Sequence, residues 1–589
     1  MRVVRRLRPE AQGVRGDRGA RPAPLSCRLM RGGIVEEIRT DVLVVGGGLA
    51  GTLAALAARE EGADVCIAMK GESGLTGNSA RAGGVFATIL EGFSLPDDSV
   101  ETMVADNFRS GWFMSDPALV RAVAGESGAA IERLRAHVVP FLEKNGRMTP
   151  TKLPGHTYPR GARVPGGGPR MMRVLGARLA QSGARVLEGM SLIGLLRDGG
   201  GRVVGADFQE EGSGVLLRLH ARATVLAMGG LGGMYPITTN APGVAGVGYG
   251  AALNAGARLR DMEFVQFTPT AMAHPPQLRG RNSGGMALSF PEARMRNNQN
   301  ERFMARYAPD DMEHAKRDIL SRAMHREIVE GRGTENGGLY LDLTKVPYDG
   351  LRDVMGEIID DFEAAGLDVR KEPIEIAPAA HSCMGGAVID TNGRTDVAGL
   401  FAAGENGGGL HGANRLASGG LTVCAVMGDR AGRAAAHVEG EGGPPEKNET
   451  SARSADEAGE AQLGEIEQEI RDVMFSAGGI ERTSVALEDG RGRIAALKER
   501  VAGVSTPASL VSRHAQARLM CLTAEAMLGS MLMRAESRGA HTRSDYPERD
   551  DENWLANIHV SLAAGGALAH ERVPVSDELR EASARHMKA

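Results

Sequence analysis

Residues 40–51 read Thr-Asp-Val-Leu-Val-Val-Gly-Gly-Gly-Leu-Ala-Gly, and this stretch decides the fold. Its apolar first half predicts a short β-strand, and the alanine-rich residues 52–61 that follow predict a helix. Between them, Gly46, Gly48 and Gly51 have the spacing of a dinucleotide-binding turn. There, glycines permit a tight turn, a close approach of the backbone to a pyrophosphate and close packing of helix on strand. The sequence therefore predicts a doubly wound, Rossmann-like α/β domain that binds a nucleotide.

A second apolar strand, residues 64–69, follows at the distance that this fold requires. In the usual fingerprint an acidic residue ends that strand and binds the adenosine ribose. Here the position is Met69 or Lys70. We therefore expect the adenosine end of the nucleotide to be held differently.

The stretch 399–421 provides a second part of the expected site. A strand ending in Gly404-Glu405 is followed by a glycine-rich turn and by Arg415, just before an apolar helix. This order places together a carboxylate for a ribityl hydroxyl, a fixed cation and free backbone N–H groups at a helix start. A flavin with a carboxylate-bearing substrate would use all three.

Length and composition limit the class of protein. A chain of 589 residues is too long for one core, so we expect two to four domains. It has no apolar run long enough to span a bilayer, and we expect a cytoplasmic protein that reaches a membrane only through a partner. A net charge of -5 without large blocks gives no surface for nucleic acid.

The five cysteines stand far apart, with no C-x-x-C spacing, so this chain alone predicts neither a zinc site nor an iron–sulfur cluster. Electrons that leave a flavin here must pass to oxygen, to a small molecule or to another subunit. Scattered cysteines also favour a reducing compartment.

A series of motifs stands in order along the chain from about residue 38 to 560. These landmarks are 46–51, 70–84, 227–230, 239–240, 261–263, 266–267, 301–303, 317–318, 381–386, 404–405, 411–418 and 536–554. Together they resemble the flavoprotein subunits of succinate dehydrogenase and fumarate reductase, and L-aspartate oxidase. The resemblance implies a capping domain inserted in the flavin domain, a helical C-terminal domain, FAD as cofactor, and hydride transfer between flavin N5 and a small carboxylate, a dicarboxylate or an enoate.

The resemblance also implies roles for particular residues. Arg317 matches the proton shuttle of the family, and His381 and Arg415 match residues that bind a substrate carboxylate. Glu405 matches the carboxylate that holds the ribityl chain. The other matching cofactor residues are Gly46, Gly48, Gly51, Lys70, Gly83, Gly84, Gly420 and Leu421, the last two through backbone N–H groups that face the flavin pyrimidine ring.

The chain departs from the family pattern at several of its positions. Thr268 replaces a carboxylate-binding histidine, and the Thr-Glu-Gly and Arg-Gly-Glu motifs that help bind the far carboxylate are absent from 282–292. Gly77 stands where respiratory members carry the flavin-linking histidine, so we expect non-covalent FAD. Val247 replaces an aspartate that contacts the flavin, and Gly420 replaces a serine.

Two other functions stay open from the sequence. One is an L-aspartate oxidase or a similar soluble oxidase, favoured by Gly77 and by the lack of a membrane segment. The other is a docking subunit for electron transfer, with an iron–sulfur partner and an altered substrate pocket, favoured by Thr268.

We expect six segments along the chain. The arginine-rich residues 1–37 form an extension, favoured as a translation start placed too early. The others are a first FAD-binding part at 38–244, a capping and substrate domain at 245–375, a second FAD-binding part at 376–437, a linker at 438–460, and a helical domain with its tail at 461–589.

Overall fold

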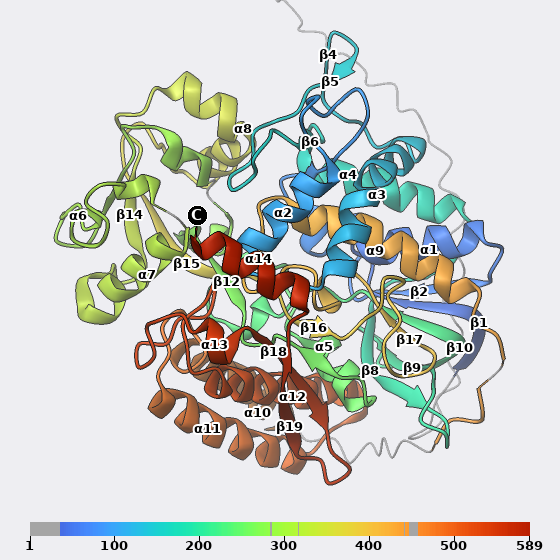
Figure 1. The fold of residues 1–589 in the computed structure, drawn as a ribbon. Coiled ribbons are helices and arrows are strands. Elements are labelled where there is room, and N and C mark those ends of the chain that lie inside the picture. Colours follow the sequence, from blue (N-terminus) through green and yellow to red (C-terminus); the bar gives the residue numbers. More distant parts are fainter. Residues whose placement is uncertain (1–35, 283–284, 316, 441, 447–457, 589) are drawn as a thin grey trace, which may run out of the picture.

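The computed structural model describes residues 36–282, 285–315, 317–440, 442–446 and 458–588 (Figure 1). The expected N-terminal extension up to residue 35 and most of the expected linker lie outside these residues. The described chain forms a nucleotide-binding part, an inserted part and a C-terminal part, as the resemblance implies. The exact boundaries between them stay predictions.

The nucleotide-binding part is built on one large sheet with the strand order β7-β2-β1-β10-β9-β8, and β17 pairs with β10. Strands β7, β2, β1, β10 and β17 are parallel, whereas β10, β9 and β8 form an antiparallel meander. Val42 to Val45 of β1 are fully buried because helices cover both faces of a parallel sheet. The strands are β1 (Glu36–Val45), β2 (Val65–Ala68), β7 (Arg185–Leu187), β8 (Met190–Arg197), β9 (Val203–Glu210), β10 (Leu216–Leu226) and β17 (Leu400–Ala402).

Two helices that are far apart in sequence cross closely on this sheet (Figure 1). They are α1 (Leu49–Glu60) and α9 (Gly419–Ala436). A Cβ atom on Gly428 would lie 2.5 Å from the carbonyl oxygen of Ala50, and one on Gly432 would lie 2.2 Å from that of Ala54. The glycines of α9 therefore allow backbone contact with α1, which brings the 404–421 stretch beside the nucleotide turn.

The inserted part has its own sheet, ordered β12-β15-β14-β13, and a separate hydrophobic core. The strands are β12 (Val265–His274), β13 (Arg294–Arg296), β14 (Leu339–Asp342) and β15 (Ile374–Cys383), and the longer helices are α7 (Arg317–Glu327) and α8 (Tyr348–Ala364). Strands β12 and β15 also reach the first core, where Val265 pairs with Cys383. The two long strands thus carry residues of the inserted part back to the flavin domain.

The C-terminal part contains three long helices and a β-hairpin. The helices are α10 (Ala458–Ser476), α11 (Ser484–Gly503) and α12 (Val511–Met533), and α14 (Asp577–Lys588) follows the hairpin. The helical tail indicated by the sequence omits the hairpin, β18 (Ala556–Leu562) and β19 (Leu568–Pro574). Strand β18 pairs with β11 (Leu259–Arg260), which itself pairs with β16 (Gly386–Ala387), so the tail completes a four-stranded sheet.

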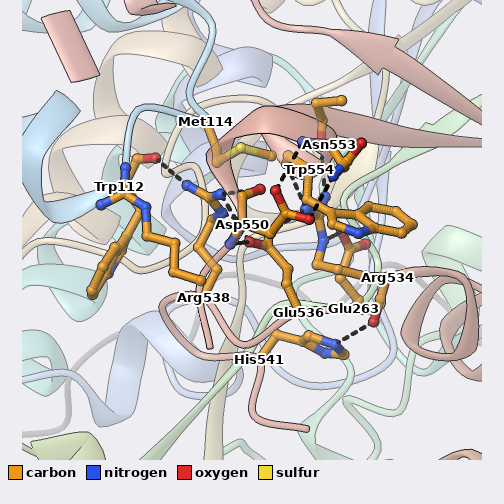
Figure 2. Close-up of polar contacts among 12 residues, drawn as sticks. Trp112, Met114, Glu263, Arg534, Glu536, Arg538, His541, Asp550, Asn553 and Trp554 are labelled. Atoms are coloured by element: carbon orange, nitrogen blue, oxygen red, sulfur yellow. Dashed lines mark hydrogen bonds and ion pairs between the residues drawn. The ribbon is translucent and has the colours of Figure 1, made fainter. Parts of the chain in front are cut away.

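A buried ionic network fixes this tail to the strand entering the inserted part (Figure 2). Arg534 Nε lies 2.7 Å from Glu263 Oε1, and Arg534 Nη1 lies 2.9 Å from Glu536 Oε1. Arg538 Nε is 2.7 Å from the same Glu536 oxygen. All four side chains are fully buried, and burial raises the pKa of Glu263 to about 7 although Arg534 acts in the opposite direction. The charge state of each of these four buried groups therefore depends on the charges of the others.

Candidate functional site

The glycines of the first turn are required by close backbone packing. Gly46 has φ +109°, and a Cβ atom there would lie 2.3 Å from the carbonyl oxygen of Ala227. A Cβ atom on Gly51 would lie 1.9 Å from the carbonyl oxygen of Gly46. Gly48 is the N-cap of α1 and provides no side-chain cap. The turn is a cradle of bare backbone at a helix start, which fits a pyrophosphate.

A Gly51→Val protein is expected to be purified without flavin colour, because the added side chain would push the start of α1 away from β1. The measurement is the ratio of FAD to protein after purification and after incubation with excess FAD. Gly125→Ala in α3 (Pro117–Ala136) is the control, since a Cβ atom there meets nothing within 4 Å. A yellow Gly51→Val protein with full FAD content would contradict the role assigned to this turn.

Glu405 lies at the other side of the same turn. It follows β17 in the short 3-10 helix η7 (Gly404–Asn406), and its Oε1 accepts a hydrogen bond of 2.9 Å from the N–H of Cys383. Burial raises the pKa of this carboxyl group, and the hydrogen bond from Cys383 opposes that shift. A Cβ atom on Gly230 would lie 2.3 Å from Glu405 Oε1, so the carboxylate fills the space that this glycine leaves.

The start of α9 offers backbone donors. Its N-cap, Ser418, has a left-handed backbone with φ 59° and makes no side-chain hydrogen bond to the helix. The first N–H groups, including those of Gly420 and Leu421, therefore have no side-chain cap and are oriented to bind an acceptor. Gly84 has φ +66° and packs against Gly167, whereas a Cβ atom on Gly83 would meet nothing within 4 Å.

Lys70 lies at the end of β2, beside a cavity of about 450 Å³. Its Nζ is 3.4 Å from Glu211 Oε1, and Ser191 and Arg513 also line the cavity. The neighbouring Met69 side chain covers Gly47, where a Cβ atom would lie 2.4 Å from the sulfur. A thioether therefore occupies the strand end at which the usual fingerprint has an acid.

The three residues expected to be catalytic come together from three elements. Arg317 begins α7, His381 lies in β15, and Arg415 precedes α9. The charges of Arg415 and Arg317 both lower the pKa of His381, and Arg317 lowers that of Arg415. Side chains separated by up to about a hundred residues in sequence thus act on one another in the fold.

Two guanidinium groups of this cluster lack a carboxylate partner. Within the described residues neither Arg317 nor Arg415 forms an ion pair, and the Nε of Arg415 is buried without a hydrogen-bond partner. Arg415 Nη2 donates to Gln266 Oε1 at 3.1 Å. Burial, followed by the charge of Arg317, lowers the pKa of Arg415 to about 10. Desolvation also lowers the pKa of Arg317, although this residue remains exposed to solvent. An anion bound here would offset both the desolvation of Arg415 and the repulsion between Arg415 and Arg317.

His381 is held in its neutral form. Burial is the largest cause that lowers its pKa to about 3, followed by the charges of Arg415 and Arg317. Its Nδ1 lies 2.7 Å from Thr239 Oγ1. When the hydroxyl donates to this nitrogen, Nε2 carries the hydrogen and is a donor.

Three further residues of the site, His411, Gln266 and Thr239, were not assigned a role from the sequence. Burial and then Arg415 lower the pKa of His411 to about 3, and Gln266 Nε2 donates to Asn414 Oδ1 at 2.7 Å. All three lie in landmarks of the family resemblance, 411–418, 266–267 and 239–240, which was the available signal. The contacts of Gln266 and Thr239 could not be predicted, because their partners lie more than a hundred residues away.

Lowering the pH from 7 to 5 is expected to destabilise the folded protein through His381 and His411. The unfolded imidazoles protonate near pH 6.5, whereas burial beside Arg415 holds the pKa of each folded imidazole near 3. Below pH 6.5 the unfolded state therefore binds more protons, and each histidine lowers the free energy of unfolding by about 1.4 kcal/mol per pH unit. Urea unfolding at pH 7, 6 and 5 measures the effect, and a His411→Gln protein with an unchanged pH slope would contradict it.

The glycine cradle, the buried Glu405 and the uncapped helix start fit FAD, and the cation cluster beside them fits an oxidoreductase that acts on an anion. The protein is an FAD-dependent oxidoreductase. Residues 41–421 match the family description "FAD binding domain", and residues 467–581 match "Fumarate reductase flavoprotein C-term". The chain belongs to the family that contains the flavoprotein subunits of fumarate reductase and succinate dehydrogenase, together with L-aspartate oxidase.

Individual relatives agree with this family. The chain is 35% identical to a subunit of the CoM/CoB fumarate reductase of Methanothermobacter marburgensis, over 89% of this chain and 97% of that protein. It is also 35% identical to an L-aspartate oxidase of Caulobacter vibrioides, over 86% of this chain and 94% of the relative. The solved structure of Mycobacterium smegmatis Sdh1 in complex with UQ1 superposes with a TM-score of 0.81 at 30% identity, covering 92% and 95% of the two chains.

Among the described residues, no helix is long and apolar enough to cross a membrane. The same residues contain no group of three or more histidine, cysteine or acidic side chains that could hold a metal ion.

Proposed function

We propose that the chain transfers a hydride between N5 of non-covalently bound FAD and a small carboxylate substrate, a dicarboxylate or an enoate. The cluster of Arg415, His381 and Arg317 carries this proposal, because the buried guanidinium of Arg415, which lacks a carboxylate partner within the described residues and lies under the influence of the Arg317 charge, favours a bound acid. The glycine turn, Glu405 and the N–H groups at the start of α9 would hold the cofactor. Gly77, at the family's linking position, has no side chain to form a covalent bond.

Arg415 and His381 are assigned to substrate binding. The planar fork of Arg415 suits a carboxylate, and its hydrogen bond to Gln266 orients the group. Neutral His381, fixed by Thr239, adds a donor without adding a second buried charge. Together they would bind one carboxylate group and polarise the carbon atoms next to it.

Arg317 is assigned to proton transfer. When an enoate is reduced, a hydride adds to one alkene carbon and Arg317 donates a proton to the other; when the saturated acid is oxidised, Arg317 accepts that proton. Desolvation lowers the pKa of Arg317, which makes its guanidinium a stronger acid than in water.

A second candidate function is L-aspartate oxidation, favoured by the similarity to the Caulobacter vibrioides oxidase. In that case an amino acid would occupy the same cation cluster and electrons would pass to oxygen. Release of peroxide on adding L-aspartate to the holoprotein in air would favour this function. Reduction of the flavin only through an added iron–sulfur protein would argue against it.

The alternative electron route is a partner subunit. Two relatives, from the CoM/CoB fumarate reductase and from the fumarate reductase of Mycobacterium tuberculosis, are named as subunits of larger enzymes. Similarity to them supports an iron–sulfur electron-transfer partner, and any membrane association would come through that partner. The five scattered cysteines are consistent with clusters being supplied by another chain.

The test is a screen of photoreduced holoprotein under anaerobic conditions. Fumarate, other enoates and imino acids are added, and recovery of the oxidised-flavin absorbance identifies an acceptor. We expect recovery with at least one acid and a loss of binding in an Arg415→Gln protein that retains FAD. If none of these compounds reoxidises the flavin, the chain is instead a docking subunit.

A further inference from the structure

His156 lies behind the turn that leads from Arg415 into helix α9. Its Nε2 is 2.9 Å from the carbonyl oxygen of Ala417, and the ring is almost fully buried. A Cβ atom on the neighbouring Gly155 would lie 2.9 Å from Leu416 Cδ1. The loop that contains His156 therefore packs directly against this turn, although 261 positions separate His156 from Ala417 along the chain.

A buried arginine fixes the tautomer of His156. Arg160 Nη1 lies 3.3 Å from His156 Nδ1, and a guanidinium group donates hydrogen bonds but cannot accept them. Nδ1 is therefore the acceptor, so the neutral ring carries its hydrogen on Nε2 and donates it to Ala417. Burial lowers the pKa of His156, which keeps the ring neutral at pH 7.

Two carboxylates in turn hold the side chain of Arg160. Its Nε and Nη2 donate to Asp98 at 2.8 and 2.6 Å, and its Nη1 pairs with Asp106. All three side chains are fully buried. Asp106 Oδ2 also accepts a hydrogen bond of 2.9 Å from the N–H of Thr157, so the same network fixes the backbone next to His156. The orientation of the imidazole ring is therefore set by buried groups of the flavin domain.

The turn that His156 contacts has an unfavourable backbone and carries groups of the site. Ser418 has φ 59°, a left-handed conformation that a residue other than glycine keeps only when its surroundings impose it. A Cβ atom on Gly420 would lie 3.7 Å from Arg415 Nη1, so the guanidinium group lies against the start of α9. A displacement of Ala417 would therefore move both this cation and the first N–H groups of the helix.

We propose that His156 is a positioning residue, which holds the turn between Arg415 and α9 through its hydrogen bond to Ala417. The proposal rests on the function proposed above, in which Arg415 binds the acid and the N–H groups at the start of α9 contact the flavin. His156 acts through the backbone of residues 416–418 and takes no part in the reaction itself.

The experiment compares wild type with His156→Leu, His156→Gln and His514→Leu, all as holoproteins. His514 is the matched control, because its Nε2 also lies 2.8 Å from a backbone carbonyl oxygen, that of Val501 in the C-terminal part. Titration of the oxidised flavin with fumarate, followed by absorbance, gives a Kd, and reductive titration gives the flavin midpoint potential. FAD content and the midpoint of thermal unfolding verify that each variant is folded.

We expect His156→Leu to weaken fumarate binding by roughly 5- to 50-fold, because Arg415 loses its fixed position. The midpoint potential should become more negative, because displaced N–H groups stabilise the negative charge of the reduced flavin less well. His156→Gln should recover part of both changes, since its amide keeps a donor near Ala417. His514→Leu should change neither quantity.

A wild-type Kd and potential in His156→Leu, or equal changes in His514→Leu, would overturn the positioning role and leave the proposed function intact. If His156→Leu does not retain FAD, His156→Gln is compared with His156→Asn, whose shorter amide does not reach Ala417, and equal behaviour of these two variants would overturn the role. If no acid perturbs the wild-type flavin, the proposed function is wrong, and the midpoint potential still decides the role of His156.

Discussion

An Arg317→Gln protein is expected to retain FAD and to bind the acid substrate, yet to turn over about 10²- to 10⁴-fold more slowly. Glutamine keeps a polar side chain at the start of α7 but cannot donate and recover a proton. Because Arg317 also lowers the pKa of Arg415, its removal should ease the burial of that cation and keep substrate affinity close to wild type.

The measurement is single-turnover reoxidation of the photoreduced flavin by the acceptor found in the screen. Arg322→Gln is the matched control, since this arginine lies on the same helix and pairs with Asp318 at 3.2 Å on a partly exposed surface. We expect it to change the rate by less than about twofold, as exposed ion pairs contribute little. Full turnover by Arg317→Gln would show that another group delivers the proton.

Loss of substrate binding together with turnover would be a different result. It would show that Arg317 binds the substrate carboxylate and does not transfer the proton. Separate measurement of the substrate Kd and of the single-turnover rate at saturating substrate distinguishes the two roles, because loss of a carboxylate-binding group raises the Kd, whereas loss of a proton donor slows the saturated rate.

An Arg534→Met protein is expected to lose about 3–5 kcal/mol of unfolding free energy, the largest change in stability that we predict. The substitution leaves the buried carboxylates of Glu263 and Glu536 without the guanidinium between them (Figure 2). It also removes a donor to the carbonyl oxygen of Ala556 at 2.7 Å, where β18 begins. The hairpin should therefore lose its attachment to the start of β12.

Urea unfolding followed by tryptophan and flavin fluorescence measures this loss. Arg585→Met is the control, because this arginine is 72% exposed beside Glu581, and we expect an effect within about 0.5 kcal/mol. Adding Glu263→Gln to Arg534→Met should recover part of the loss, since it removes the buried carboxylate whose ion-pair partner is lost, whereas Glu536 keeps its pair with Arg538. Equal stability of Arg534→Met and wild type would mean that the network is neutral and that packing alone holds the tail.

The arrangement of the flavin domain follows closely from the sequence. The apolar run before Gly46, the glycine spacing and the alanine-rich helix are local patterns, and the structure places them as β1, the turn and α1. The helical C-terminal domain was also indicated by the sequence, and the structure has its long helices α10, α11 and α12 there. The β18–β19 hairpin was not indicated, because β18 needs partners, β11 and β16, from distant parts of the chain.

By itself, the sequence determined the class of fold, because turn glycines, helix starts and strand patterns are properties of neighbouring residues. The cofactor and the candidate residues followed from the resemblance of its motifs to a known family. Only the tertiary structure decided which charges meet. The charges of Arg415 and Arg317 act on each other, and burial beside them holds His381 in its neutral form. These relations arise from burial and from Coulomb interactions between segments that folding brings together, and both depend on distance in space and not on separation along the chain.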